Sequence, residues 1–304
     1  MNLLFHTPAP DEQCAVRNAA ERSLSRENDA AFANIFLLRG KYGTELAWEG
    51  AKLFRRYRCG YRAESYGFPL GEPAALRESV LMLNADAAER GVRMRFTLLT
   101  EAQGAALDAA FPGAFVFTEA EGYTEYLYLQ ENLAFLRGSK YHGKRNHIAQ
   151  FWRSDPDAMI QPLVAENVQF AVEIARAWLE NRENPAEPSL QAELHCIEEA
   201  AMCFDALHLS GLLLYSHGQP IGMTMVSEIS TGIWDVHFEK VRPLNPHAYP
   251  VVSNEMAKCL THAEYINREE DLGESGMRQS KQSYRPDILN LKFNAALREG
   301  VTLC

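Results

Sequence analysis

Three ionisable side chains alternate along one short stretch, WDVHFEKV at residues 234–241. In an extended strand Asp235, His237 and Glu239 share one face, because side chains alternate with a period of two. Such a face could move protons: Glu239 or His237 would deprotonate an acceptor amine, and Asp235 would orient the histidine. The alternative is the wet side of an antiparallel sheet, where charged residues have no further role.

A second candidate is the basic run at residues 137–153, which holds five Lys/Arg and no Asp or Glu in a chain of net charge -10. Placed on a helix, Lys144 and Arg145 border an apolar stripe formed by Tyr141, Ile148, Phe151 and Trp152. The two cations could hold a phosphate or carboxylate in a cleft. They could equally lay their stems over apolar surface with the charges in water. Asn146 and His147 would add hydrogen bonds to the predicted donor site.

The polar segment NREEDLG at residues 267–273 follows a short predicted strand. Asn267, Glu269 and Asp271 are candidate ligands for the ammonium group of an amino acid, at a loop position where binding residues often lie. The alternative is structural, with Asp271 or Ser275 capping the next helix and the glutamates in water.

Basic and aromatic residues come next. Arg278, Lys281 and Arg285 extend the predicted donor-binding site, and Tyr284 could donate a proton to a leaving group.

The segment 239–256 lies where an acyl-CoA enzyme of the predicted fold would bind pyrophosphate on backbone N–H groups. It contains no glycine but has Pro243, Pro246 and Pro250, which lack an N–H. Arg242 and His247 could bind phosphate with side chains instead. The sequence therefore disfavours ordinary acetyl-CoA use without excluding it.

Both halves of the chain are predicted to have the same element order of meander, helix, strand, helix, strand. In the first half these elements are expected at 34–58, 72–91, 93–99, 101–111 and 114–130, with Pro73 near the start of the first helix. In the second half, helices at 161–182 and 189–207 precede elements at 208–241, 251–263, 265–267, 276–284 and 288–293. We therefore predict an α+β fold of two GNAT-like domains, at 1–135 and 136–304, with the active site in the second.

The composition and charge of the chain argue against several classes of protein. No apolar run is long enough to span a bilayer, and no secretory leader is evident. Six cysteines without a CxxC pair predict reduced, buried thiols in a cytosolic protein, and no metal site. The acidic balance argues against DNA binding. A second basic run, 52–58, could contact RNA or form an exposed strand face, and the latter is favoured.

Three motifs carry a resemblance to a known family. KYHGKRNHIAQF (140–151), NREEDLGESGMRQSKQSYRP (267–286) and SYGFPLG (65–71) resemble signatures of soluble bacterial proteins related to the C-terminal catalytic domain of phosphatidylglycerol lysyltransferase. The resemblance covers roughly residues 32–293. It implies a tandem GNAT fold akin to enzymes that move an amino acid from aminoacyl-tRNA to an amine or lipid hydroxyl. Lipid-modifying members carry membrane helices ahead of this domain, and this chain has none.

The functional prediction is an acyl- or aminoacyltransferase. Its donor would be an activated ester, either aminoacyl-tRNA or acyl-CoA, and an amine or hydroxyl would attack it directly. A CoA-dependent N-acetyltransferase is the first alternative. The second is a non-catalytic protein that binds a small anion or metabolite. The sequence leaves the acceptor and the oligomeric state open.

Overall fold

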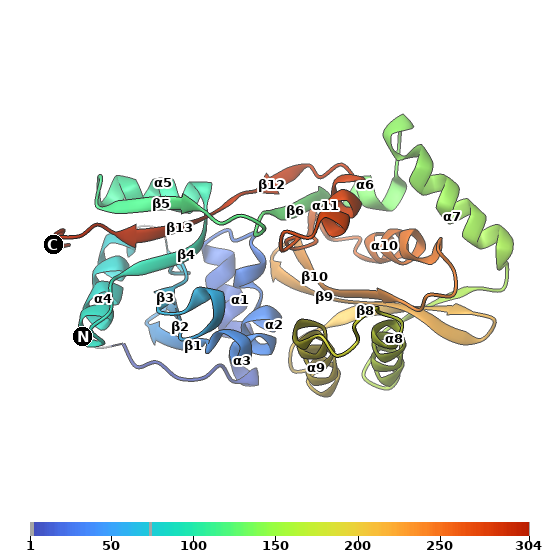
Figure 1. Cartoon of the computed structure of the whole chain (residues 1–304), viewed down its shortest axis with the longest axis horizontal. Coiled ribbons are helices and arrows are strands. Elements are labelled where there is room, and N and C mark those ends of the chain that lie inside the picture. The colour runs from blue at the N-terminus through green and yellow to red at the C-terminus, as the bar shows by residue number, and fades with distance from the viewer. Residues whose placement is uncertain (1–2, 73–74, 304) are drawn as a thin grey trace. The chain divides into compact units, whose positions relative to one another are not determined.

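A computed structural model describes residues 3–72 and 75–303 (Figure 1). Its contacts divide the chain into two compact units. Unit 1 comprises Met1–Tyr126, Glu269–Gln279 and Ile288–Cys304, and unit 2 comprises Leu127–Arg268 and Ser280–Asp287. The predicted boundary between residues 135 and 136 stays a prediction, since these units are built from interleaved segments of the chain. Pro73 lies outside the described residues.

Unit 1 contains a six-stranded sheet of order β1-β2-β3-β4-β13-β5. The strands are β1 Glu45–Glu49, β2 Lys52–Tyr57, β3 Ser65–Tyr66, β4 Arg95–Thr100, β5 Phe115–Glu119 and β13 Lys292–Leu297. Its helices are α1 Gln13–Arg22, α2 Phe32–Leu37, α3 Arg39–Tyr42, α4 Leu76–Glu89 and α5 Glu101–Ala110, with 3-10 turns at Pro10–Glu12, Asn28–Ala30 and Gly60–Arg62. Phe54, Tyr66, Leu83, Phe96 and Leu99 fill its core.

The second sheet has seven strands in the order β12-β6-β11-β10-β9-β8-β7. They are β6 Glu125–Leu129, β7 Met159–Pro162, β8 Ser210–Ser216, β9 Gln219–Ser230, β10 Ile233–Val241, β11 Tyr265–Asn267 and β12 Ile288–Asn290. The remaining helices are α6 Gln130–Phe135, α7 His142–Ser154, α8 Gln169–Glu180, α9 Pro188–Met202, α10 Ala248–Cys259 and α11 Ser275–Gln282, and a 3-10 turn, Ser139–Tyr141, precedes α7.

Helices cover both faces of the β8–β10 meander. Figure 1 shows α10 on one face and α8 with α9 on the other. Val251, Val252 and Met256 of α10 are buried against the strands. A Cβ at Gly222 of β9 would lie 2.6 Å from a methyl of Val252, so only glycine lets α10 pack this closely. This close packing fixes α10 beside the far end of β10.

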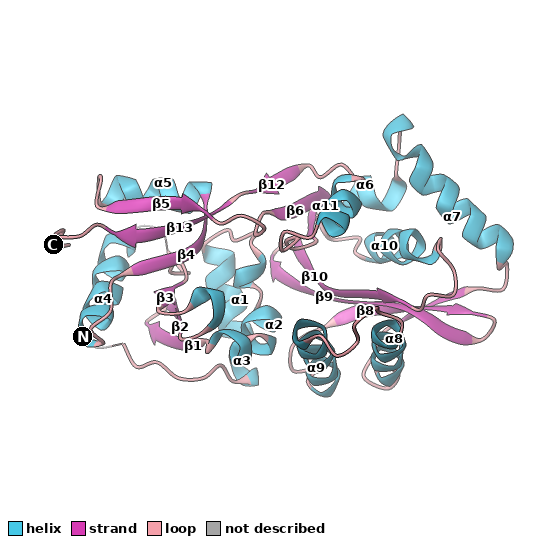
Figure 2. Cartoon of the chain, viewed as in Figure 1, coloured by secondary structure: helices cyan, strands magenta, loops and turns pink. Residues whose placement is uncertain are grey.

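The two halves repeat one element order, as Figure 2 shows for helices and strands. β1, β2, β3, α4, β4, α5, β5 and β6 correspond in order to β8, β9, β10, α10, β11, α11, β12 and β13. In both, the third and fourth strands, β3–β4 and β10–β11, pair in parallel. The predicted α+β fold of two mixed sheets with a repeated order is confirmed.

Four local predictions are wrong. The helix predicted at 161–182 begins only at Gln169, because Met159–Pro162 pair with β8 as strand β7. Residues 34–39, predicted as strand, lie in α2 and the start of α3, because their apolar side chains are buried together on short helices. The run 52–58 is not an exposed face: Arg55 is buried and donates to the carbonyl oxygens of Asp29 and Phe68. The cysteines are free but not buried among the described residues, because they occupy outward positions on helices and turns.

Candidate functional site

The candidate site lies in unit 2, where β10 and β11 stop pairing. Their parallel register runs from Ile233–Tyr265 to Asp235–Asn267, where β11 ends, while β10 continues to Val241. No described strand pairs with this edge of β10 beyond Asp235. Glu239 extends from this part of β10, and Arg268 follows β11 directly. An ion pair joins them, with Arg268 Nη2 3.0 Å from Glu239 Oε1.

Lys144 of α7 and Tyr284 complete the cluster. The Lys144 Nζ lies 3.8 Å from the centre of the Tyr284 ring, and the Arg268 Cζ lies 5.0 Å from the same centre. Tyr284 is buried, and Lys144 is half-buried. Three residues, Lys144, Arg268 and Glu239, therefore put two positive charges and one negative charge beside one aromatic ring.

The pKa values of the ionisable groups in the cluster are shifted in different directions. Burial, and then the charge of Arg268, lower the pKa of Lys144 to about 8, against an opposing effect of Glu239. Burial also opposes the charge on Arg268, but the Glu239 carboxylate outweighs it and raises the pKa of Arg268. Burial, countered by Arg268, raises the pKa of Tyr284 to about 12. Tyr284 therefore keeps its proton more firmly than an ordinary tyrosine.

Two buried polar atoms of the Glu239–Arg268 pair lack a hydrogen-bond partner among the described residues. They are Oε2 of Glu239, which can accept, and Nη1 of Arg268, which can donate. Leaving a buried charged group partly unsatisfied costs about 1–3 kcal/mol or more. The pair thus offers a donor and an acceptor that a ligand could satisfy together.

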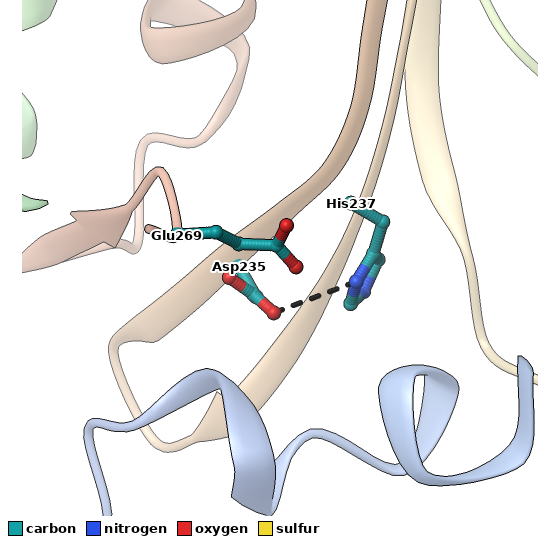
Figure 3. Close-up of side chains that lie close together, drawn as sticks. All are labelled: Asp235, His237 and Glu269. Atoms are coloured by element: carbon teal, nitrogen blue, oxygen red, sulfur yellow. Dashed lines mark ion pairs between the residues drawn. The ribbon is translucent and has the colours of Figure 1, made fainter. Parts of the chain in front are cut away.

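Asp235 and His237 lie further back on β10 (Figure 3). The His237 Nδ1 is 3.4 Å from Asp235 Oδ2, and the His237 Nε2 is 2.7 Å from the Ser227 hydroxyl on β9. Asp235 therefore lies beside the histidine, and its orienting role stays a prediction. The wet-face alternative is wrong because these side chains are buried. Burial lowers the pKa of His237 to about 3, so the imidazole is neutral near pH 7 and is a weak base.

The predicted basic helix exists as α7, and its polar residues have different surroundings. Arg145 donates to the carbonyl oxygens of Leu136 and Gly138, which follow α6. The Asn146 amide lies 3.1 Å from His142 Nε2. His147 Nδ1 lies 2.8 Å from His247 Nδ1, at the N-terminus of α10. Of Lys144, Arg145, Asn146 and His147, only Lys144 is in the cluster with Glu239.

The NREEDLG residues have several environments. Asn267 is fully buried at the end of β11. Glu269, the third side chain drawn in Figure 3, belongs to unit 1, where its carboxylate accepts from Asn34. Asp271 accepts from Tyr126, from the Gly273 N–H and from Arg278. Its pKa falls to about 2, because these hydrogen bonds outweigh its burial.

The last predicted residues flank Tyr284. Lys281 is half-buried, and its backbone carbonyl accepts from the Tyr128 hydroxyl at 2.8 Å. Arg285 is exposed, with a positive φ of 55°. Tyr284 alone among these three contacts Lys144. The binding roles predicted for Lys281 and Arg285 stay predictions.

The segment 239–256 has the expected glycine-free entry into α10. His247 is the N-cap residue of the helix, and its ring contacts His147. Arg242 is half-buried, 3.9 Å from Glu173. The first turn of α10 contains Pro250, which has no N–H to offer a phosphate.

Sequence reasoning missed Arg268 and Ser227. Arg268 stands inside the NREEDLG segment, between two residues that were named, and it is a cation placed directly after a buried strand. Parallel pairing of that strand with 234–241 would have placed Arg268 beside the strand that carries Glu239. Ser227 has no comparable signal, because only the β9–β10 register places it opposite Asp235.

Comparison with known proteins gives three informative similarities. The chain is similar to a conserved protein of unknown function from Bacteroides thetaiotaomicron, with 28% identity, a TM-score of 0.93 and coverage of 97% of this chain and 100% of that one. It is similar in fold to the C-terminal domain (DUF2156) of a putative lysylphosphatidylglycerol synthetase from Agrobacterium fabrum, at 12% identity and TM-score 0.65, covering 96% and 93%.

The third is L-PGS from Bacillus licheniformis, at 13% identity and TM-score 0.61, covering 90% of this chain and 88% of that one. No curated protein matches the sequence. Among the described residues, no helix combines the length and the apolar character that crossing a bilayer requires.

The family described as phosphatidylglycerol lysyltransferase, C-terminal, matches residues 21–296, which is most of the chain. This agrees with the resemblance of the three sequence motifs and with the two mixed sheets. The protein therefore belongs to the phosphatidylglycerol lysyltransferase C-terminal family.

Proposed function

We propose that the protein is an aminoacyltransferase that moves an aminoacyl group from an activated ester, such as aminoacyl-tRNA, to an amine or hydroxyl acceptor. The observation that carries this proposal is the pair of unsatisfied atoms on Glu239 and Arg268. Family membership supports the same class of reaction.

An aminoacyl ester has the groups that these two atoms need. Its α-ammonium would donate to Glu239 Oε2, and its ester carbonyl oxygen would accept from Arg268 Nη1. A simple acetyl ester could satisfy Arg268 but would leave the Glu239 oxygen unpaired. Because an unmade hydrogen bond to a charged group is costly, the site should prefer esters that carry an amine.

Charge development in the reaction fits the same residues. When the acceptor attacks the carbonyl carbon, negative charge grows on the carbonyl oxygen, and Arg268 would stabilise it. The acceptor must also lose a proton. Since His237 is a weak base, we assign this role to Lys144, whose pKa of about 8 suits a base near neutral pH. Tyr284 would hold Lys144 in place through its ring.

The donor's carrier group would lie beside α7 and the N-terminus of α10. The glycine-free, proline-containing entry to α10 is poorly suited to a CoA pyrophosphate. The exposed polar face of α7, with Asn146 and His147, could contact the phosphates of a nucleic-acid carrier.

A ligand screen on the full chain tests the proposal. Thermal unfolding would be measured with acetyl-CoA, aminoacyl-tRNA and free amino acids, followed by assays of aminoacyl-tRNA consumption with added amines. Binding at a hundred times the dissociation constant should stabilise the fold by about 2.7 kcal/mol. We expect protection by aminoacyl-tRNA. Protection by acetyl-CoA alone would contradict the proposed donor and indicate acetyl-CoA instead. Binding of these donors without turnover would indicate a binding protein.

A further inference from the structure

Lys144 is an unusual lysine because of its contacts. It is half-buried, and among the described residues it has no carboxylate within ion-pair distance and no hydrogen bond. Its Nζ lies over the face of the Tyr284 ring, 3.8 Å from the centre, and the Arg268 guanidinium lies against the same ring. An amine that is desolvated and placed near another cation is favoured in its neutral, nucleophilic form.

Other lysines of unit 2 either form an ion pair with a carboxylate or are exposed to water. Lys240 forms an ion pair with Glu193 at 2.8 Å, and Lys258 pairs with Glu255 at 2.8 Å. Lys140 lies one helical turn before Lys144 and is exposed, although its Nζ also lies 4.9 Å from the centre of the Tyr141 ring. Lys140 thus provides an internal comparison on the same segment, with an amine open to water.

We propose that Lys144 is a covalent modification site, whose Nζ accepts an acyl group from activated carboxyl esters. The neutral amine attacks the ester carbonyl carbon, a C–N bond forms, and the C–O bond of the ester breaks. The proton lost from nitrogen goes to the departing alkoxide or phenoxide. The product is an amide, which removes the positive charge and is stable to water. This goes beyond aminoacyl transfer to an external acceptor, and labelling requires no turnover.

Two opposing effects set the expected ratio of the acylation rates of Lys144 and an exposed lysine. At pH 8 an amine with a pKa of about 8 is half neutral, whereas an ordinary lysine with a pKa near ~10.4 is roughly a hundredfold less so. A less basic nucleophile is intrinsically slower, by about tenfold for this difference if amines follow a Brønsted slope like that of thiols. Lys144 should therefore react about tenfold faster than an exposed lysine.

The charged groups around Lys144 predict whether each substitution slows or accelerates its acylation. Glu239 faces it from β10, Arg268 from the residue after β11 and Tyr284 with its ring, and Arg145 and His147 are on its own helix. Replacing Arg268 with methionine removes a cation and should slow acylation of Lys144 near pH 7. Glu239→Gln removes an anion and should accelerate it. A general loss of structure would instead make Lys144 and Lys140 alike.

The experiment uses the full chain and p-nitrophenyl acetate, with acetyl occupancy of the Lys144 and Lys140 peptides followed by mass spectrometry at several pH values. We expect Lys144 to acylate about tenfold faster at pH 8, with a rate that levels off above that pH while Lys140 continues to rise. The two variants should shift the Lys144 rate in opposite directions. Equal rates at Lys144 and Lys140, or an unlabelled Lys144, would overturn the proposal.

Discussion

Each unit contains a cluster of charges, but positive and negative charges are balanced differently in the two clusters. In unit 1, Lys292 pairs with Glu125 at 2.6 Å and Arg62 pairs with Asp29 at 2.5 Å, all four largely buried. Each charge there has an opposite partner. In unit 2, Lys144 and Arg268 face the single carboxylate of Glu239. Among the described residues, buried atoms without a hydrogen-bond partner occur in both clusters, Arg62 Nε and Lys292 Nζ in unit 1 and Glu239 Oε2 and Arg268 Nη1 in unit 2, so the difference lies in the balance of charge.

The difference separates a structural from a functional use of buried charge. Glu125 also accepts from the Asn28 N–H and the Asn290 amide, so its oxygens are bonded within the protein. Such a network holds segments that are distant in sequence in fixed positions. The cluster of unit 2 instead carries excess positive charge, which is an arrangement expected where an anionic or polar ligand completes a site.

The largest expected effect comes from breaking the unit 1 network. Lys292→Met leaves Glu125 without its charged partner in a buried site, and such a loss typically costs about 3–5 kcal/mol. The free energy of unfolding should be measured in urea. The double variant Lys292→Met with Glu125→Leu should recover much of the loss. If the single substitution changes stability by less than about 1 kcal/mol, the network is not structural.

Glu125 also predicts a pH dependence. Burial outweighs Lys292 and raises the pKa of Glu125 to about 7, whereas it is near ~4.3 in an unfolded chain. Between these values the folded state holds a proton that the unfolded state releases. This contribution to stability, no more than about 4 kcal/mol, is present in acid and lost as the pH rises through 7.

Glu125→Gln removes this titration. Urea unfolding between about pH 4.5 and 7.5 should therefore show a smaller decline of stability with rising pH than in the unmodified protein. Identical pH profiles for the two proteins would show that Glu125 titrates normally, and the contrast between the units would then be weaker.

A smaller effect is expected on the rate of aminoacyl transfer when Glu239 is replaced. Glu239→Gln keeps the shape of the side chain but removes the charge that would bind the ammonium, so kcat/KM for an aminoacyl ester should fall by about 10- to 100-fold, as for a charged hydrogen bond of about 1.5–3 kcal/mol. Asp271→Asn is the matched control, since Asp271 bonds to Tyr126 and Arg278 in unit 1. Equal losses in both variants would argue against a specific role of Glu239.

The smallest expected effect is the change in stability when Lys144 is replaced, and its direction distinguishes the two units. The lowered pKa of Lys144 means that its charge is disfavoured in the folded state. Lys144→Met should therefore leave stability unchanged or raise it, by less than about 1 kcal/mol once solvent screening is allowed for, while transfer is lost. Thermal unfolding at pH 7 measures this. A clear destabilisation would place Lys144 with the structural charges of unit 1.

The sequence predicted the element order well, because apolar periodicity and turn residues are local signals. The helix at α7, the β8–β10 meander and the short β11 all follow from such patterns. Sheet membership was not predictable. β6 lies between β11 and β12, and β13 lies between β4 and β5, which depends on pairing between distant segments.

The candidate site was predicted in part. Lys144, Glu239 and Tyr284 were named from residue type and position, and the structure brings them together with Arg268. Arg145 and Asp271 have the right chemistry for binding, but carbonyl oxygens and a neighbouring arginine engage them. A side chain's partners depend on tertiary contacts, which one sequence does not specify.

The central claim is that Glu239 and Arg268 together recognise an aminoacyl ester. It is tested most directly by calorimetric titration with two stable analogues, a 3′-aminoacyl amide of adenosine and the same compound without its α-amine. We predict that the amine-bearing analogue binds at least about tenfold more tightly, as expected for a hydrogen bond to a charged group. Equal affinities for the two analogues would contradict the assignment.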